Sequence, residues 1–536
     1  MNFPSVKPTK ESKNKKLTDI YKFFGALLFI LTIVWYATTL THGISQPVLL
    51  IVATVFGGYM ALNIGANDVA NNVGPAVGSQ AITILGAVIV AGVFEALGTF
   101  IAGGNVVGTI KSGIIDPSLI QNSSTFVWLM MAALLAGAIW LNLATAFGAP
   151  VSTTQSIVGG VMGSGIAAVG FNMVNWFEMG KIISSWITSP LLGGIISAVF
   201  LIIIKKTIIY KEDKRLAAKT MVPLLLSFMT WAFSTYIILK GLKKLIHLNF
   251  SIAAFIGLLI AIGVYFYTRS SIIKKADTLE NTRAGINKLF NIPLIFSAAL
   301  LSFAHGSNDA ANAIGPLAGI YDTLAKGDVL STANIPLWVM AVGAIGIVVG
   351  LSLYGPKLIK TVGSEITELD QIRAFCVAIS AALTVIIASQ LGLPVSSTHI
   401  AIGAVFGVGF LREYLMKNPL KDVQEEIEQH KINTEMEKLE EYKHALESLG
   451  KLKKVDPILV KSLMTKINEE KAIIINIHEG ELELSKIEKK AIKAVKKHEL
   501  VKRSALKMII AAWLITVPVS ALLSAMFYYM LRGILL

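Results

Sequence analysis

Two short blocks of polar residues each occur twice in this 536-residue chain, and they place ion-binding side chains inside apolar stretches. The first block, Gly65–Pro75, recurs as Gly306–Pro316. Its polar members are Asn67, Asp68, Asn71, Asn308, Asp309 and Asn312. A carboxylate in hydrocarbon is unfavourable unless it is paired or faces water, so two acids at matching points of a repeat favour a functional site over structural helix caps.

The chemistry of this first block suits a hard cation. Carboxylate and amide oxygens are ligands that such ions prefer, so Na⁺ is the candidate ion at Asp68 and Asp309. Glycine and proline interrupt helices and free backbone carbonyls for the same purpose. We therefore expect a helix break at the glycines and prolines of each copy, which are Gly65, Gly74, Pro75, Gly306, Gly315 and Pro316.

The second block favours an anion. Gly148–Gln155 recurs as Gly392–His399, and its polar members are Ser152, Thr153, Thr154, Gln155, Ser396, Ser397, Thr398 and His399. Proline is common in the first turn of a helix, where hydroxyls lie beside unpaired N–H groups that bind anions. Two such turns that meet within the membrane would hold a tetrahedral oxyanion from opposite sides.

The charges of these groups suggest coupled transport. Two aspartates and a phosphate would bring a charge of about −3 to −4 into one site of low dielectric constant. No Lys or Arg lies within the repeat helices, and Lys111, near a helix end, is expected at the interface. Cations or protons must therefore enter with the anion. Glu95 is a third membrane acid without an acidic counterpart, and we expect it to act in ion coupling or gating, or else in helix pairing.

The composition is that of a membrane protein. Hydrophobic residues make up 54% of the chain, charged residues 15%, and the mean hydropathy is +0.66. These values predict an all-α polytopic protein with about 12 membrane helices. The net charge of +14 lies in the tail and loops, where the positive-inside rule explains it, so we expect no nucleic-acid partner. The sequence shows no nucleophile–base pair, metal-ligand cluster or nucleotide motif, so we expect no enzyme activity and no cofactor.

The distribution of basic loops and the repeats predict the domain organisation. Loops 205–219 and 269–289 are basic and should be cytoplasmic, so the two repeats start on opposite sides and are inverted. The predicted parts are a basic cytoplasmic tail with an extra transmembrane helix (1–46), a first inverted repeat (47–204), a linker with two transmembrane helices (205–289), a second inverted repeat (290–411), a charged helical cytoplasmic insertion (412–505) and the last helix of the second repeat (506–536).

Both blocks, with their second copies, closely resemble the motifs of the inorganic phosphate transporter family called PiT. The resemblance covers roughly 47–411 and the last helix. It implies an inverted-repeat helical fold in the cell membrane, with re-entrant Pro-broken hairpins, and a homodimer. It also implies cation roles for the six residues of the Asn–Asp blocks and phosphate contacts for the eight residues of the Ser/Thr blocks.

The function that we expect is a secondary active transporter that imports inorganic phosphate by symport with Na⁺ or H⁺ through alternating access. One alternative is a sulfate symporter of the same fold. Sulfate only accepts hydrogen bonds, whereas phosphate also donates one, and Asp68 and Asp309 offer an acceptor. A different alternative is a membrane sensor or scaffold that acts through 412–505. If the chain is a transporter, we expect 412–505 to be an accessory domain or to dock a cytoplasmic regulator.

Overall fold

The computed structural model describes residues 10–44, 46–120, 122–146, 151–241, 248–327, 335–365, 369–415, 436, 438–446, 461–469, 471 and 503–535. Most of the predicted insertion lies outside these residues, as do Gly148, Ala149 and Pro150 of the first Ser/Thr block. The chain divides into two compact units, Phe410–Leu500 and the remainder, and the account that follows concerns the larger one.

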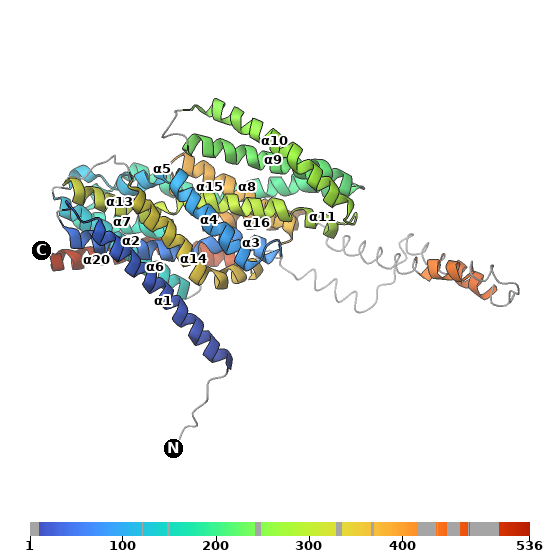
Figure 1. The fold of residues 1–536 in the computed structure, drawn as a ribbon, viewed down its shortest axis with the longest axis horizontal. Coiled ribbons are helices and arrows are strands. Elements are labelled where there is room, and N and C mark those ends of the chain that lie inside the picture. The colour runs from blue at the N-terminus through green and yellow to red at the C-terminus, as the bar shows by residue number, and fades with distance from the viewer. Residues whose placement is uncertain are drawn as a thin grey trace, which may run out of the picture. The chain divides into compact units, whose positions relative to one another are not determined.

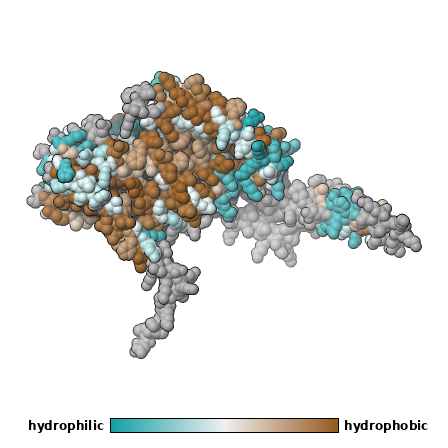
Figure 2. Space-filling model, in the orientation of Figure 1, coloured by the Kyte–Doolittle hydropathy of each residue, from teal (hydrophilic) through white to brown (hydrophobic). Residues whose placement is uncertain are grey.

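The described part of the chain is all-α, as predicted, with one isolated bridge between Ile115 and Val174 and no strand. Ten of its helices are long and apolar enough to cross a membrane, or up to eleven if a pair of helices bent by 46° counts as one span, against the expected dozen. Figure 2 shows hydrophobic residues over the middle of the helical unit and hydrophilic residues towards its ends, as a bilayer requires.

Figure 1 shows the helices in chain order from blue to red, and the predicted boundaries group them into a first half, a linker and a second half. After α1 (Lys10–Thr39), the first half contains α2 (Pro47–Asn67), α3 (Val69–Gly78), α4 (Ile84–Ala102), α5 (Gly104–Gly108), the π-helix η1 (Thr109–Gly113), η2 (Pro117–Leu119), α6 (Ser123–Ala146), α7 (Thr153–Val169), η3 (Phe171–Met173) and α8 (Trp176–Ile204). The linker contains η4 (Lys205–Ile209), α9 (Lys214–Gly241), α10 (Phe250–Asp277) and α11 (Arg283–Leu289). The second half contains α12 (Asn291–Asn308), α13 (Ala311–Lys326), α14 (Leu337–Glu365), α15 (Gln371–Gln390), α16 (Ser397–Leu415) and α20 (Arg503–Leu535).

Each Asn–Asp block lies at a helix break, but the break is not where the glycines and prolines predict it. Helix α2 ends at Asn67, and Asp68 lies between it and α3. Helix α12 ends at Asn308, and Asp309 and Ala310 lie between it and α13. Pro75 and Pro316 instead lie inside α3 and α13. A proline inside a helix removes the N–H that would bond the carbonyl four residues earlier, so the carbonyls of Asn71 and Asn312 lose that donor. The backbone carbonyls that are free to bind an ion are therefore those of Asn71 and Asn312.

Helices of the first half pack against helices of the second half. Helix α2 packs on α14 and α12 on α4, while α20 packs on α6 and α7 and α8 packs on α15. Glycines allow the closest of these contacts, because a Cβ on Gly98 would lie 2.0 Å from the carbonyl oxygen of Phe303, and one on Gly306 would lie 2.2 Å from that of Glu95. Helices α4 and α12 thus approach backbone to backbone, which small residues permit in membrane proteins.

This contact predicts a position-specific cost for one added methyl group. We expect Gly98→Ala to lower the stability of the folded protein by roughly 1–3 kcal/mol, because the backbone of α12 must move. The matched control is Gly263→Ala on α10, where a Cβ meets nothing within 4 Å. Thermal unfolding of both purified variants in detergent measures the difference, and equal melting temperatures would contradict the close approach of α4 and α12.

Candidate functional site

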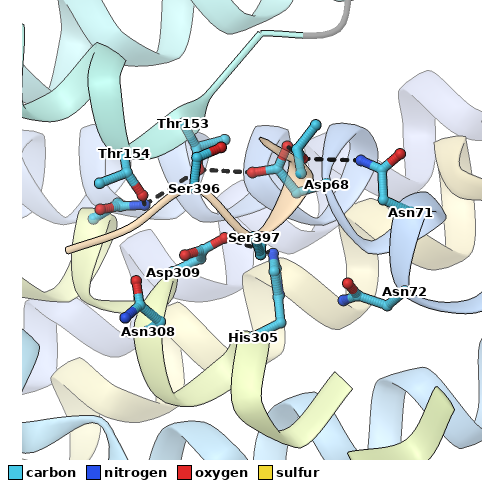
Figure 3. A network of polar contacts seen from close by, with 12 residues as sticks. Asp68, Asn71, Asn72, Thr153, Thr154, His305, Asn308, Asp309, Ser396 and Ser397 are labelled. Carbon is cyan, nitrogen blue, oxygen red and sulfur yellow. Dashed lines mark hydrogen bonds and ion pairs between the residues drawn. The ribbon is translucent and has the colours of Figure 1, made fainter. Parts of the chain in front are cut away.

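The sequence-predicted residues of both halves meet in one buried network (Figure 3). Oγ1 of Thr398 donates to Oδ1 of Asp68 at 3.1 Å and accepts from Nδ2 of Asn71 at 2.9 Å. In the opposite direction, Nδ2 of Asn312 donates to Oγ1 of Thr153 at 3.2 Å and to Oγ1 of Thr154 at 3.1 Å. The Asn–Asp block of each half therefore contacts the Ser/Thr turn of the other half.

Each aspartate also accepts a hydrogen bond from the Ser/Thr turn of its own half. Oγ1 of Thr153 donates to Oδ2 of Asp68 at 2.7 Å, and Oγ of Ser397 donates to Oδ2 of Asp309 at 2.6 Å. Thr153 and Ser397 occupy matching positions of the two copies. The repeated sequence therefore produces a repeated contact, in which a hydroxyl donates to the carboxylate.

Both Ser/Thr turns begin helices, as the sequence predicts. The hydroxyl of Ser152 accepts from the N–H of Gln155 at 3.1 Å, and that of Ser396 accepts from the N–H of His399 at 3.3 Å. These two serines therefore cap α7 and α16. Gln155 and His399 follow in the first turn of each helix, and the ring of His399 stacks on Trp513 of α20 at 4.4 Å between centroids.

Several polar atoms of the site are buried without a hydrogen-bond partner. They are Oδ1 of Asp309, Oδ1 of Asn312, Oε1 of Gln155, Nδ2 of Asn67 and both ring nitrogens of His399. Buried polar groups are normally satisfied by protein, water or a ligand, so these atoms are available for a ligand. The oxygens suit a cation and the amide and ring nitrogens suit further hydrogen bonds, which fits the mixed ion site predicted from the sequence.

Asn308 differs from the other asparagines because its side chain fastens the second Ser/Thr turn. Its Nδ2 donates to the carbonyl oxygen of Leu393 at 3.1 Å and to Oγ of Ser389 at 3.0 Å. Its Oδ1 accepts from the N–H of Val395 at 3.2 Å. Asn308 thus bonds the backbone on both sides of Pro394 and positions the turn.

A buried acid–base pair lies beside this network. Oε2 of Glu95 lies 2.7 Å from Nδ1 of His305, and Oε1 accepts from Nδ2 of Asn72 at 2.9 Å. The other ring nitrogen of His305, Nε2, lies 2.9 Å from Oδ2 of Asp309, in a geometry that makes the contact electrostatic rather than a hydrogen bond. Glu95 is therefore connected to Asp309 through His305.

The sequence reasoning missed His305 and Asn72. His305 precedes Asp309 by four residues and so lies on the same helix face, which is the signal that points to it. One atom each of Asp68, His305 and Asp309 lies within 4.8 Å of the others, so these three form the one group among the described residues that can hold a metal ion. The histidine has an isoleucine, Ile64, at the matching position of the first half.

The geometry defines a class of protein before any comparison. A bundle of membrane-spanning helices, drawn from two halves, encloses buried carboxylates, amides and hydroxyl-bearing helix N-termini. Polar and ionisable residues inside the membrane mark pathways for ions and substrates, and discontinuous helices at such a site are typical of secondary transporters. The chain is therefore a multi-pass membrane transporter.

Comparisons with known proteins identify the family. Residues 64–524 match the profile of the phosphate transporter family. A protein of Helicobacter pylori strain J99, named "Putative phosphate permease", is 50% identical over 535 residues, which is 98% of this chain and 98% of its own. A Pyrococcus furiosus protein described in the same words is 39% identical over 385 residues, 71% of this chain and 92% of its own.

A solved structure agrees. The protein titled "The sodium-dependent phosphate transporter" has a TM-score of 0.72 and 31% identity, and the match covers 91% of this chain and 100% of that one. The chain belongs to the phosphate transporter family, as its motifs predict. Its relatives transport rather than catalyse a reaction, which agrees with the prediction that it is not an enzyme.

The contact between Glu95 and His305 predicts a coupling free energy. Removing one partner leaves the other buried with an unmet charge, so Glu95→Gln and His305→Gln should each lower the melting temperature. The double variant removes both groups, and we expect its loss to be smaller than the sum by roughly 1.5–3 kcal/mol. Thermal unfolding of the four purified proteins measures this coupling, and additive losses would show that the two side chains act independently.

Proposed function

We propose that this protein imports inorganic phosphate together with cations, by alternating access of its two halves to the central site. The observation that carries the proposal is the sharing of hydroxyls between the two kinds of block. The hydroxyl of Thr153 donates to Asp68 and accepts from Asn312, while that of Thr398 donates to the same aspartate and accepts from Asn71. Groups suited to an anion and groups suited to a cation are thus bonded to one another.

These shared hydroxyls supply a physical reason for coupling. A hydroxyl has one proton to donate, and in this network Thr153, Ser397 and Thr398 donate it to a carboxylate. A cation that binds Asp68 or Asp309 satisfies the carboxylate oxygens and releases these hydroxyls to donate to phosphate. Binding of the cation therefore favours binding of the anion, and the reverse follows by thermodynamic linkage.

The charges of the buried groups support the same coupling. Asp68, Asp309 and Glu95 are 2%, 1% and 0% exposed, and His305 is the one basic side chain that the described residues place in contact with them. Phosphate adds further negative charge. Because an uncompensated charge in such a site is unfavourable by several kcal/mol, cations must accompany the anion.

Sodium is the favoured cation. The carboxylates of Asp68 and Asp309 and the unpartnered amide oxygen of Asn312 are hard ligands of the kind that Na⁺ binds. The structural neighbour is described by its title as sodium-dependent. On this basis we assign the cation roles to Asn67, Asp68, Asn71, Asp309 and Asn312, and a positioning role to Asn308. The proton is the second candidate for the coupling ion, since the same aspartates can bind one.

Phosphate is favoured over sulfate because the site has a free acceptor. Phosphate carries a proton that it must donate, and Oδ1 of Asp309 is a buried acceptor without a partner. The phosphate contacts that we propose are Ser152, Thr153, Thr154, Gln155, Ser396, Ser397, Thr398 and His399, of which Ser152 and Ser396 act through the helix N-termini that they cap.

The organisation around the site is part of the proposal. The inverted orientation of the halves, the predicted domain boundaries, the homodimer and a regulator of 412–505 remain predictions from the sequence. Membership of a transporter family favours an accessory role for 412–505 over a chain that acts as a sensor or scaffold.

A gradient experiment tests the coupling ion and the anion together. In proteoliposomes with radiolabelled phosphate, we expect uptake when a Na⁺ gradient is imposed and none with a pH gradient alone. Unlabelled phosphate should compete with the uptake and sulfate should not. Uptake driven only by the pH gradient would replace Na⁺ by H⁺ at the aspartates, and stronger competition by sulfate would overturn the choice of phosphate.

Substitution of the aspartates tests the cation site. Asp68→Asn and Asp309→Asn keep the shape of the side chain but remove its charge, so phosphate uptake should fall at least about tenfold for each, since bonds to a charged group contribute roughly 1.5–3 kcal/mol. The matched control is Asp277→Asn, a side chain 59% exposed at the end of α10, which should transport normally. Unchanged Na⁺-driven uptake by both site variants, with folded protein in the membrane, would remove the cation assignment.

A further inference from the structure

A buried ion pair joins the first half of the chain to the second. Nζ of Lys111 lies 2.6 Å from Oδ2 of Asp322, and each side chain is 5% exposed. The expectation that no Lys or Arg lies within the repeat helices is wrong, because Lys111 belongs to the helical turn η1 and is buried against α13. The charge of Lys111 is taken up by Asp322, so this lysine does not offset the charge of the central site.

The pair lies close to one end of the helical bundle. Lys326, which follows Asp322 by one turn, is 51% exposed and lies 3.6 Å from Oδ1 of Asp322. Tyr321, next to Asp322 in the chain, packs edge-to-face on Trp338 with 5.3 Å between ring centroids. Such aromatic residues mark the level of the membrane interface. The ion pair is thus about one helical turn below the surface.

Lys111 belongs to η1, and η1 contacts both parts of the second half that bear site residues. Its Ile110 occupies the space beside Gly315 of α13, where a Cβ would lie 3.0 Å from the isoleucine side chain. Oγ1 of Thr109 donates to the carbonyl oxygen of Gly392 at 2.7 Å, two residues before Pro394. Because α13 starts beside Asp309, η1 lies along the segment that leads from the site to the surface.

The local sequence lets this segment move. Gly104 and Gly108 precede η1, and a Cβ on either would meet nothing within 4 Å, so packing does not require glycine there. Glycine weakens a helix, and π-helical turns are frequent at functional sites. Tertiary contacts, above all the buried ion pair, therefore hold η1 in place more than its own helix does.

We propose that Lys111 and Asp322 form the gate of the central site on the membrane face where α13 ends, which is the outer face on the predicted topology. When paired, they hold η1 over the second half and close the site. When they separate, η1 moves and water enters. The proposal rests on the alternating-access transport proposed above.

An ion pair is suited to this task for a physical reason. Two buried charges attract each other but lose their hydration, so the net stability of the closed state is small. Separation into water restores the hydration of both groups, and the open state is then close in free energy to the closed one. An apolar contact at the same place would favour the closed state alone, because opening would expose it to water.

Cysteine labelling tests the gate without any need for transport. The chain has a single cysteine, the buried Cys376, so Cys376→Ala with Ala318→Cys gives one reporter. Ala318 is 1% exposed and lies one turn of α13 nearer the site than Asp322. A membrane-impermeant maleimide is added to intact cells and, separately, to inverted membrane vesicles.

We expect Lys111→Met and Asp322→Asn to raise the rate of labelling about tenfold from the outer face only, which corresponds to about 1.4 kcal/mol. The exchanged pair, Lys111→Asp with Asp322→Lys, should return the rate to within about threefold of the parent, because opposite charges meet again. Lys181→Met is the matched control, since Lys181 pairs with Glu178 on an exposed surface of α8 and should leave the rate unchanged. An unchanged rate in both single variants, or an equal rise from both faces, would overturn the gate.

A second variant separates a gate from a merely structural ion pair. Lys111→Met with Asp322→Met replaces the charges by an apolar contact that favours the closed state, so the folded protein should melt at the same or a higher temperature. Its labelling should stay at or below that of the parent, and its phosphate uptake should fall. Uptake equal to the parent would overturn the proposal. Labelling as expected in a chain that transports no phosphate would refute the proposed function but not the gate.

Discussion

The structure depends on the constraint that carboxylates inside a membrane must be satisfied without being neutralised. Among the described residues, the one basic side chain in contact with either Asp68 or Asp309 is His305, which lies 2.9 Å from Asp309 and is shared with Glu95. Hydroxyls of Thr153, Ser397 and Thr398 solve this by donating hydrogen bonds to the carboxylates while leaving their charge in place. The carboxylates of the network are therefore hydrogen-bonded although they are buried.

Close helix packing makes this network possible. Glycines at 98 and 306 bring the backbones of α4 and α12 together, and the hydroxyl of Thr99 donates to the carbonyl oxygen of Gly306 at 3.2 Å. This approach places Glu95 against His305 and excludes water from both. The close packing also strengthens the hydrogen bonds of the site, because a hydrogen bond is electrostatically stronger in a dry interior than in water.

The two halves share the ion-binding groups but not the groups around them. The matching contacts of Thr153 with Asp68 and of Ser397 with Asp309 follow from the repeat. The second half has His305 beside its aspartate, where the first half has Ile64. A residue outside the repeats, Tyr236 of α9, also donates to Oγ of Ser307 at 3.1 Å, and the described residues show no such contact to the first block. The two copies of the block therefore lie in different surroundings although their sequences match.

The sequence by itself determined the class of protein and named most residues of the candidate site. Long apolar segments indicate membrane helices, because in hydrocarbon the backbone N–H and C=O groups can bond only to one another. A duplicated polar block within such segments is itself the signal of a functional site. The position of the Ser/Thr residues at helix N-termini was also predictable, because proline and hydroxyl residues act within one turn.

Only the tertiary structure decided which polar groups pair. Glu95 and His305 are 210 residues apart, and Lys111 and Asp322 are 211 apart, so no local pattern connects them. The helix break at Asp68 rather than at the proline, and the attachment of Asn308 to the turn around Pro394, also depend on what packs against each segment. Local propensity is weak compared with tertiary contacts, and the partners of a buried charge are chosen by the helices that happen to lie beside it.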